Sequence, residues 1–290
     1  MRPSVNIAVC ICTYRRDSVV DAIRSVAAQG LPDGLGIRIV VADNDDLPSA
    51  RERVLGAGSE VAVTYVHAPA RNISVARNAC LAAAREDYIA FMDDDETAPP
   101  DWIANLWACI GRTEADAVFG PARAVYPAGT PDWIRQNDFL SNLPQERSGV
   151  VETGHTCNVL MRRSDLRFRV DLGRSGGEDT DYFFRLRRRG FRFAICETAS
   201  VYEAADPRRL RLGWLIERRF AEGRHYGAAA VQGPMRLLAG SMAKATYSTL
   251  RALPHLINPP GLAFWGLRAV FHAGLCAGAL WGASGRRAYG

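Results

Sequence analysis

Residues 88–95 read YIAFMDDD, a short apolar run that ends in three aspartates. The run has the length and the β-branched and aromatic content of a buried strand. Two earlier runs have the same form, VNIAVCIC at residues 5–12 and IRIVVA at residues 37–42. Thr13 and Tyr14 follow the first of these, and Asp43 follows the second. Polar residues are therefore expected at the ends of three strands that lie far apart in the sequence.

Helical patterns separate these strands. Helices are expected within residues 17–27, 49–55, 72–85, 101–110 and 182–189, and further strands at 61–66, 117–120, 156–161 and 191–195. This alternation predicts an α/β fold with a mainly parallel central sheet. Ligands bind beyond the carboxyl ends of such strands, so the three polar clusters are expected to meet in one crevice. The proline-rich residues 121–144 are expected to form a loop or lid over it.

The composition is that of a globular protein. The chain has 290 residues, of which 48% are hydrophobic and 23% are charged, which excludes a mostly disordered chain. The formal charge of +5 is too small to indicate a nucleic-acid-binding protein. However, residues 204–290 hold 12 basic and 3 acidic side chains, a basic tail that suits an anionic membrane surface or a phosphate-rich ligand. The alternative is a set of solvated arginines.

The seven cysteines form no Cys-x-x-Cys pair, and their number is odd. We therefore expect reduced thiols in a cytosolic protein and no zinc site. The first residues run directly into the strand at residues 5–12, so no signal peptide is expected.

The aspartates after residue 92 are the first candidate ligand site. Asp93 and Asp95 are two residues apart, so in extended chain they point to the same side. Two carboxylates there suit Mg²⁺ or Mn²⁺ bound together with substrate phosphates, although a solvated acidic turn would look the same. Asp43 could accept hydrogen bonds from a base or ribose, or cap its own loop. Tyr14 could stack on a base, or pack half-buried.

Two further groups flank helix starts. Arg71 and Arg77 lie around the start of the helix expected at 72–85, where arginines can hold phosphate or remain surface charges. Glu178 and Asp179 follow two glycines and open a helix, whose N-terminus stabilises a carboxylate in its charged form. Such a carboxylate could act as a general base, or simply cap the helix.

Together these parts resemble the family-2 glycosyltransferases, which have the GT-A fold, over roughly residues 5–223. The matching stretches are AVCICTYRR (8–16), VVADN (40–44), ARNISVARNA (70–79), YIAFMDDDE (88–96), HTCNVLMRR (155–163) and GEDTDYFFRLRRRGF (177–191). The tail, beginning with WLIERRF at 214–220, looks most like the subset that builds bacterial exopolysaccharides such as succinoglycan.

The resemblance implies a role for each matching position. It implies a UDP-sugar donor whose uracil and ribose are held by Thr13, Tyr14 and Asp43, with Arg71, Arg77, Asp93 and Asp94 also on the donor side. It further implies that Asp95, with Asp93, contacts Mn²⁺ or Mg²⁺, and that Asp179 is the catalytic base with Glu178 beside it.

The chain departs from the family pattern in two places. Trp214, Arg218 and Arg219 fall where relatives carry a Gln-x-x-Arg-Trp motif that binds acceptor or diphosphate, but the motif is absent as written. Its absence argues against a processive synthase. Tyr202 and Glu203 stand where many relatives have a metal-binding histidine.

The resemblance thus predicts a GT-A catalytic domain at 1–223 and a membrane-associated helical tail at 224–290. The expected reaction is inverting transfer of glucose from UDP-glucose, with UDP-galactose, UDP-N-acetylglucosamine and dTDP-sugars as other donors. The expected acceptor is a polyprenyl-diphosphate-linked oligosaccharide at the inner face of the cell membrane, and no nucleic acid is involved. A nucleotidyltransferase for sugar phosphates and a non-catalytic membrane-associated scaffold are the alternatives.

Residues 261–283 are long enough to span a bilayer. Arg268 and His272 lie near the middle of this segment, and a central arginine is costly there. A helix in the membrane surface, or a hairpin with residues 235–253, is therefore favoured over a single span. A buried helical pair on a soluble body is the alternative.

Overall fold

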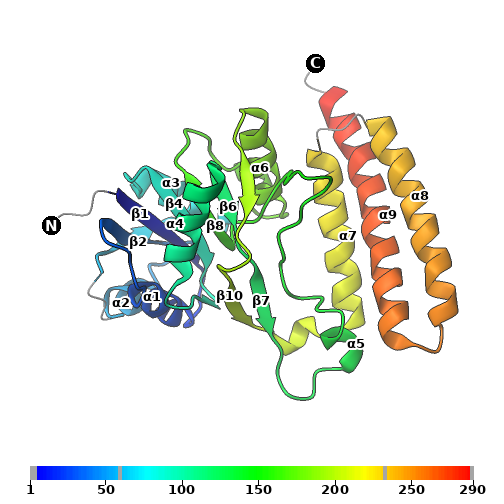
Figure 1. Ribbon diagram of the computed structural model, residues 1–290, viewed down its shortest axis with the longest axis horizontal. Helices are drawn as coiled ribbons and strands as arrows, with labels where there is room; N and C mark the ends of the chain where they lie inside the picture. Colours follow the sequence, from blue (N-terminus) through cyan, green and yellow to red (C-terminus); the bar gives the residue numbers. More distant parts are fainter. Residues whose placement is uncertain (1–4, 58–60, 231–233, 288–290) are drawn as a thin grey trace. The chain divides into compact units, whose positions relative to one another are not determined.

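The computed structural model describes residues 5–57, 61–230 and 234–287, with side chains up to Leu280. Its central sheet has the strand order β3-β2-β1-β4-β8-β6-β9 (Figure 1). The strands are β1 (Val5–Thr13), β2 (Leu35–Asp43), β3 (Val63–His67), β4 (Tyr88–Asp93), β6 (Ala117–Phe119), β8 (Asn158–Arg162) and β9 (Phe193–Ile195). All neighbours are parallel except β8, which runs antiparallel to β4 and β6. The predicted mainly parallel α/β sheet is confirmed.

A small second sheet has the order β5-β10-β7, with β5 (Glu96–Thr97), β10 (Val201–Ala204) and β7 (Ala122–Val125). The helices that follow the strands of the large sheet are α1 (Val19–Ala27), α2 (Arg51–Leu55), α3 (Ile73–Ala83), α4 (Trp102–Thr113) and α6 (Glu178–Arg188), with a short 3-10 turn at Val170–Leu172. Each of the five helices expected from the sequence is present.

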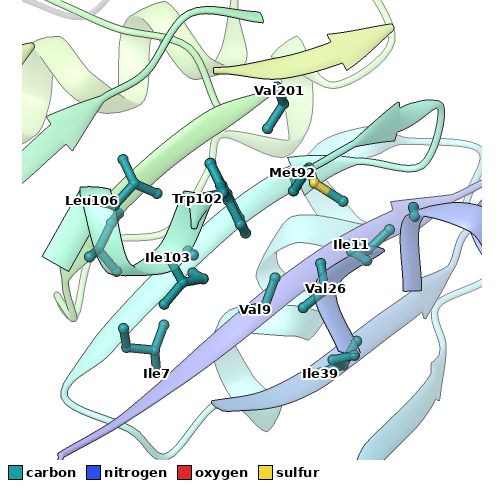
Figure 2. Packing of buried hydrophobic residues seen from close by; sticks show 14 of the residues in the cluster. Ile7, Val9, Ile11, Val26, Ile39, Met92, Trp102, Ile103, Leu106 and Val201 are labelled. Atoms are coloured by element: carbon teal, nitrogen blue, oxygen red, sulfur yellow. The ribbon is translucent and has the colours of Figure 1, made fainter. Parts of the chain in front are cut away.

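The strands of the large sheet are buried on both faces, so alternate residues feed two separate cores. Ile7, Val9 and Ile11 of β1 point to one face, where α1 and α4 cover them (Figure 2). Ala8 and Cys10 point to the other face, against α3 and α6. Because side chains on both faces of the sheet are buried, each of these strands needs consecutive apolar residues and not an alternation of apolar and polar ones.

All seven cysteines are free, as expected, and six of them lie in these strands and helices or directly at their ends. The sulfur atoms of Cys12 and Cys80 are 4.0 Å apart, about twice the length of a disulfide bond.

The chain divides into two units. One comprises residues 1–123 and 141–204, and the other comprises residues 124–140 and 205–290. The expected boundary at 223 falls inside α7 (Leu212–Ala229), an uninterrupted helix that belongs wholly to the second unit. Part of the expected lid also belongs to the second unit, because α5 (Asp132–Arg135) buries Ile134 against Leu215 and Leu267.

The second unit is built on three long helices, α7, α8 (Pro234–Ala252) and α9 (Pro259–Arg287), with 3-10 turns at Pro207–Arg209 and Leu253–His255. Figure 1 shows α9 lying alongside both α7 and α8. Between α7 and α9 the backbones touch at glycines. A Cβ atom added at Gly223 would lie 2.0 Å from the Phe271 oxygen, and one added at Gly278 would lie 2.0 Å from the Arg224 oxygen.

Gly227 and Gly274 complete a pattern of two Gly-x-x-x-Gly pairs that face each other. Small residues at this spacing let helices approach closely, a feature common where helices pack in lipid. Among the described residues, one helix is long and apolar enough to cross a membrane, over Pro259–Leu280. Arg268 is exposed, whereas His272 is only 7% exposed, so these two side chains of α9 have different surroundings.

The glycine contacts predict that a glycine-to-alanine substitution changes stability in opposite directions at two positions of α9. Gly278→Ala should lower the free energy of unfolding by about 1–3 kcal/mol, because the added methyl group must push two backbones apart. Gly266→Ala on the same helix has no atom within 4 Å of the new Cβ and should be stabilising by up to about 1 kcal/mol. Urea unfolding followed by circular dichroism compares the two. Equal effects of the two variants would contradict the close packing of α7 on α9.

Candidate active site

The predicted meeting of three strand ends is confirmed by the register of the sheet. Thr13, the last residue of β1, is the partner of Asp43, the last residue of β2. On the other side of β1, Cys12 is the partner of Asp93, the last residue of β4. The polar residues after these strands form one cluster at this edge, which we call the strand-end site.

Asp43 is fully buried and organises the loop that follows β2. Its Oδ2 accepts hydrogen bonds from the Tyr65 hydroxyl at 2.8 Å and the Ala50 amide at 2.9 Å, and its Oδ1 accepts one from the Asp45 amide at 3.1 Å. Burial and the neighbouring Asp43 raise the pKa of Tyr65, so this hydroxyl keeps its proton and donates. The loop-capping role considered from the sequence is thus present, and base or ribose binding by Asp43 stays a prediction.

The loop after β1 is tied to the loop after β2. Arg15 has a positive φ of 55° and donates from Nε to Asp45 at 2.9 Å. This hydrogen bond is the main reason that the pKa of Asp45 falls to about 2. Tyr14 is 37% exposed, and the Arg15 guanidinium lies over its ring, 5.2 Å from the centroid. Stacking of a base on Tyr14 stays a prediction.

Asp94 and Asp95 are bridged by an arginine that sequence reasoning did not single out. Arg16 Nη1 lies 2.8 Å from Asp94 Oδ1 and 2.5 Å from Asp95 Oδ2. Thr13 donates its hydroxyl to Asp94 Oδ2 at 2.7 Å. Thr13 and Asp94 thus hold each other, and Arg16 presents a cation at the same place. The only feature of the sequence that could have pointed to Arg16 is its position three residues after the end of a strand.

Asp93 is surrounded by like charges. Burial raises its pKa to about 7, Asp95 and Asp94 push the pKa in the same direction, and Arg77 opposes them. Glu96 accepts a hydrogen bond from the Asp93 amide at 2.8 Å, and burial raises the pKa of Glu96 well above its usual range. Glu203 of β10 is the register partner of Glu96 and acts in the same direction on both groups. Glu203 thus adds a carboxylate beside the cluster, at the position where many relatives were expected to carry a histidine.

The donor chemistry of this cluster fits a divalent cation. Asp93 and Asp95 offer hard carboxylate oxygens, and a cation would relieve the repulsion that raises the pKa of Asp93. Within the described ranges, no group of three or more His, Cys, Asp or Glu side chains is arranged to hold a metal by itself.

Arg71 and Arg77 lie in different surroundings. Arg71 is half-exposed, has a positive φ of 45° and is ion-paired with Asp46. Arg77 is buried, forms a short ion pair with the buried Glu178, and lies 5.6 Å from the centre of the Phe168 ring. The Arg77–Glu178 pair joins α3 to the first residue of α6.

Asp179 follows Glu178 in the first turn of α6, after Gly176 and Gly177, which both have positive φ near 85°. Its Oδ1 accepts the Thr180 amide at 2.7 Å. Its Oδ2 lies 3.2 Å from His155 Nδ1. Although burial raises the pKa of Asp179, the contacts with His155 and the charge of Arg77 lower it further than burial raises it. Asp179 is therefore held as a carboxylate.

His155 is the second residue that sequence reasoning missed. It precedes β8, and Asn158, the first residue of β8, is the register partner of Met92 near the end of β4. Because β8 is antiparallel, its beginning lies at the edge where β4 ends. His155 opens one of the stretches that match the family, but only the antiparallel direction of β8 brings it to the strand-end site.

Trp214, Arg218 and Arg219 belong to the second unit and make their contacts there. The Arg209 guanidinium lies 5.8 Å from the centroid of Trp214, and Arg218 is paired with Glu222 at 2.7 Å. Arg219 also binds Glu222, at 2.8 Å, and donates to the Phe139 carbonyl. Acceptor or diphosphate binding by these residues stays a prediction.

The buried ion pair between α3 and α6 predicts a strong stability effect. Arg77→Met leaves the Glu178 carboxylate buried without its partner and should lower the free energy of unfolding by about 3–5 kcal/mol. The double variant Arg77→Met/Glu178→Met should recover part of that loss, because neither charge of the pair is then left buried without its partner. Urea unfolding measures both, with the exposed Arg85→Met as the control. A stable Arg77→Met that loses only ligand binding would contradict the structural role.

Comparisons with known proteins identify the family of this chain. Residues 8–168 match the family described as Glycosyl transferase family 2. The chain is 39% identical over 289 residues to the succinoglycan biosynthesis protein ExoM of Rhizobium meliloti, covering 96% of this chain and 94% of that protein. The expected likeness to a protein of exopolysaccharide assembly is thereby confirmed.

Solved structures show the same fold at low identity. A mannosyltransferase from Pyrobaculum calidifontis, solved with GDP-Man and Mn²⁺, superposes with a TM-score of 0.61 at 21% identity, covering 98% of this chain and 88% of that one. Residues 1–349 of TarS from S. aureus superpose with a TM-score of 0.50 at 15% identity, covering 98% and 92%. The fold is therefore GT-A-like, and this chain belongs to glycosyl transferase family 2.

Proposed function

We propose that the protein transfers a hexose from a UDP-sugar, with UDP-glucose as the first choice, to a hydroxyl group of a polyprenyl-diphosphate-linked saccharide in exopolysaccharide assembly. The observation that carries the proposal is the strand-end site, in a chain that belongs to a glycosyltransferase family and is 39% identical to a succinoglycan biosynthesis protein. The position of the reaction at the inner face of the membrane follows from the lipid-linked acceptor and the basic tail.

In this proposal the donor lies across the ends of β1, β2 and β4. Tyr14 stacks on the uracil, because its ring is the exposed aromatic surface of the loop after β1. Asp43 and Thr13 shape the uracil and ribose pocket, and Arg71 offers a half-exposed guanidinium toward phosphate. Arg77 does not bind the donor directly in this proposal, since its guanidinium is already paired with Glu178.

Asp93 and Asp95 would hold Mn²⁺ or Mg²⁺ with the donor diphosphate, and such an ion supplies positive charge that stabilises the leaving group. Asp94 keeps Thr13 and Arg16 in place beside them. Arg16 adds a permanent cation at the same edge, where charge develops on the leaving diphosphate. A base at the Asp179 position accepts the proton of the acceptor hydroxyl. Attack from the face opposite the leaving group inverts the anomeric carbon.

The two alternatives fit less well. A nucleotidyltransferase should carry a glycine-rich phosphate loop after its first strand, and residues 13–16 read TYRR without a glycine. A non-catalytic scaffold gives no reason for placing Asp93 and Asp179, with their shifted pKa values, at one edge of the sheet. Membership of a glycosyltransferase family also favours transfer over both.

Nucleotide binding tests the proposed donor class. In the presence of Mn²⁺, UDP at 100 times its Kd should stabilise the purified protein by about 2.7 kcal/mol, seen as a rise in Tm, whereas GDP, dTDP and CMP should have smaller effects. EDTA or Asp95→Ala should abolish the rise, because the carboxylate that shares the ion with the diphosphate is lost. A rise with GDP or dTDP instead would change the donor class, and no rise with any nucleotide would refute the proposal.

The helical unit is proposed to bind the membrane surface. Helix α8 exposes three basic side chains, Arg236, Lys244 and Arg251, and contains no acidic residue. Large apolar side chains are exposed on α8 and in the turn after it: Met235 (77%), Met242 (57%), Leu250 (59%), Leu253 (55%), Leu256 (66%) and Ile257 (97%). Cationic and apolar groups together suit an anionic lipid interface.

Vesicle sedimentation tests this attachment. The protein should sediment with vesicles containing phosphatidylglycerol more than with phosphatidylcholine vesicles, and high salt should weaken but not abolish binding. The variant Ile257→Ser/Leu253→Ser should release a large part of the protein, because two exposed apolar anchors are removed. Leu55→Ser, at a 56% exposed leucine of α2, serves as the matched control and should have no effect. Binding that is indifferent to lipid charge and to Ile257 would contradict the attachment.

A further inference from the structure

Arg16 is paired with one of the carboxylates to which the proposed cation is assigned. Its Nη1 lies 2.5 Å from Asp95 Oδ2 and 2.8 Å from Asp94 Oδ1, so one nitrogen atom joins both aspartates. Because Mg²⁺ binds carboxylate oxygens at about 2.0–2.1 Å, a divalent cation on Asp95 would stand close to this guanidinium. A guanidinium is always charged, and two positive charges at such a separation repel each other. Arg16 and the cation therefore compete for Asp95.

The two aspartates that Arg16 joins are held in different ways. Asp94 is buried and also accepts a hydrogen bond from the Thr13 hydroxyl at 2.7 Å. Asp94 therefore keeps a partner if the guanidinium moves away. Asp95 is only half-buried, so an ion arriving from solvent can reach it. Of the two contacts, the one with Asp95 can thus be exchanged without leaving a buried carboxylate unpaired.

The Arg16 side chain is placed to change partners. It comes from the loop between β1 and α1 and is 45% exposed. Exposed side chains change rotamer within nanoseconds. The planar fork of N–H donors on a guanidinium matches phosphate oxygens as well as carboxylate oxygens. Rotation of this side chain can therefore replace a carboxylate by a phosphate group.

The neighbouring arginines have other partners. Arg15 donates to Asp45, and Arg71 is ion-paired with Asp46, and both of these aspartates belong to the loop after β2. Neither aspartate is assigned to the cation. Of these three arginines, Arg16 is thus the one whose salt bridge uses a proposed cation ligand.

Resting on the proposed function, we infer that Arg16 is the resident counter-ion of Asp95, which it leaves when a divalent cation binds there, and that it then pairs with the diphosphate of the donor. If the cation arrives alone, Arg16 loses a carboxylate and gains only water. If a nucleoside diphosphate arrives as well, the released guanidinium gains a charge-assisted hydrogen bond to phosphate. Arg16 therefore couples the two ligands, so that each strengthens the binding of the other by the same factor.

Mn²⁺ binding to the purified protein without nucleotide, followed by electron paramagnetic resonance, tests the exchange. Arg16→Met should bind Mn²⁺ about 5-fold or more tightly than the wild type, because no cation has to be separated from Asp95 first. A gain in affinity is a result that a damaged fold would not produce. The tightening of Mn²⁺ binding by UDP should in turn be smaller in Arg16→Met than in the wild type, because the contact with phosphate is lost.

Two further variants separate the Asp95 contact from a general effect of charge. Arg15→Met removes one positive charge from the same loop but releases Asp45, so its Mn²⁺ affinity should stay within about twofold of the wild type in 0.15 M salt. Arg16→Lys keeps the positive charge and should keep the weaker Mn²⁺ binding of the wild type. Circular dichroism of each variant checks that the fold is retained.

Two outcomes would overturn the inference. Equal Mn²⁺ affinity of Arg16→Met and the wild type, or no detectable binding of Mn²⁺ to either, would show that Arg16 does not compete for Asp95. An equal gain in Arg15→Met would show that the charge of the loop, and not the contact with Asp95, weakens cation binding.

The nucleotide-induced rise in Tm separates this inference from the proposed function. A wild-type protein without any such rise would refute the proposed function, and with it the pairing of Arg16 with the donor diphosphate. A wild-type protein whose Tm rises with UDP and Mn²⁺, beside an Arg16→Met with unchanged Mn²⁺ affinity, would refute the inference alone.

Discussion

The parallel pairing of β1 with β2 on one side and with β4 on the other is the constraint on which the site depends. Thr13 is matched with Asp43 and Cys12 with Asp93, so three strands end at one edge within a single residue of register. A shift of one residue along β1 would exchange its two faces, and Ile7, Val9 and Ile11 would then enter the core that is shaped around the smaller Ala8 and Cys10. The packing of Ile7, Val9 and Ile11 against α1 and α4 therefore also determines where the carboxylates stand.

Placing several carboxylates together at the edge of the sheet costs free energy unless cations lie beside them. Two arginines supply these cations in different ways. Arg77 is buried and permanent, joining α3 to α6 through Glu178 and acting on Asp93 and Asp179 at the same time. Arg16 is 45% exposed and bridges Asp94 and Asp95 from the loop after β1. One of these cations is thus buried in the core, and the other is partly exposed at the edge where the donor is proposed to bind.

The sequence predicted the strands, the helices between them and the meeting of Thr13, Asp43 and Asp93, because short apolar runs followed by polar residues are local patterns. It could not predict the partners of these residues. That Arg77 faces Glu178 depends on a contact between segments 101 residues apart. That His155 reaches Asp179 depends on β8 running antiparallel, which no local pattern reveals. The division into two units could not be read from local patterns for a similar reason. Residues 124–140 belong to the second unit because Ile134 is buried among helices far along the chain.

The helical unit packs its interior with glycine and leaves several large apolar side chains exposed on its surface. At the contact of α7 with α9 the space is taken by backbone, because Gly223, Gly227, Gly274 and Gly278 bring the helices too close for larger side chains. The cluster beside this seam is small, with Leu237, Leu275 and Ala279 at its centre. Larger apolar residues of α8 and of the turn after it are exposed, Ile257 at 97%. In water such a surface is unfavourable, whereas at a lipid interface the same residues lower the free energy of the attached state. Glycine inside the unit, with leucine and methionine on its surface, is the arrangement on which the proposed membrane attachment rests.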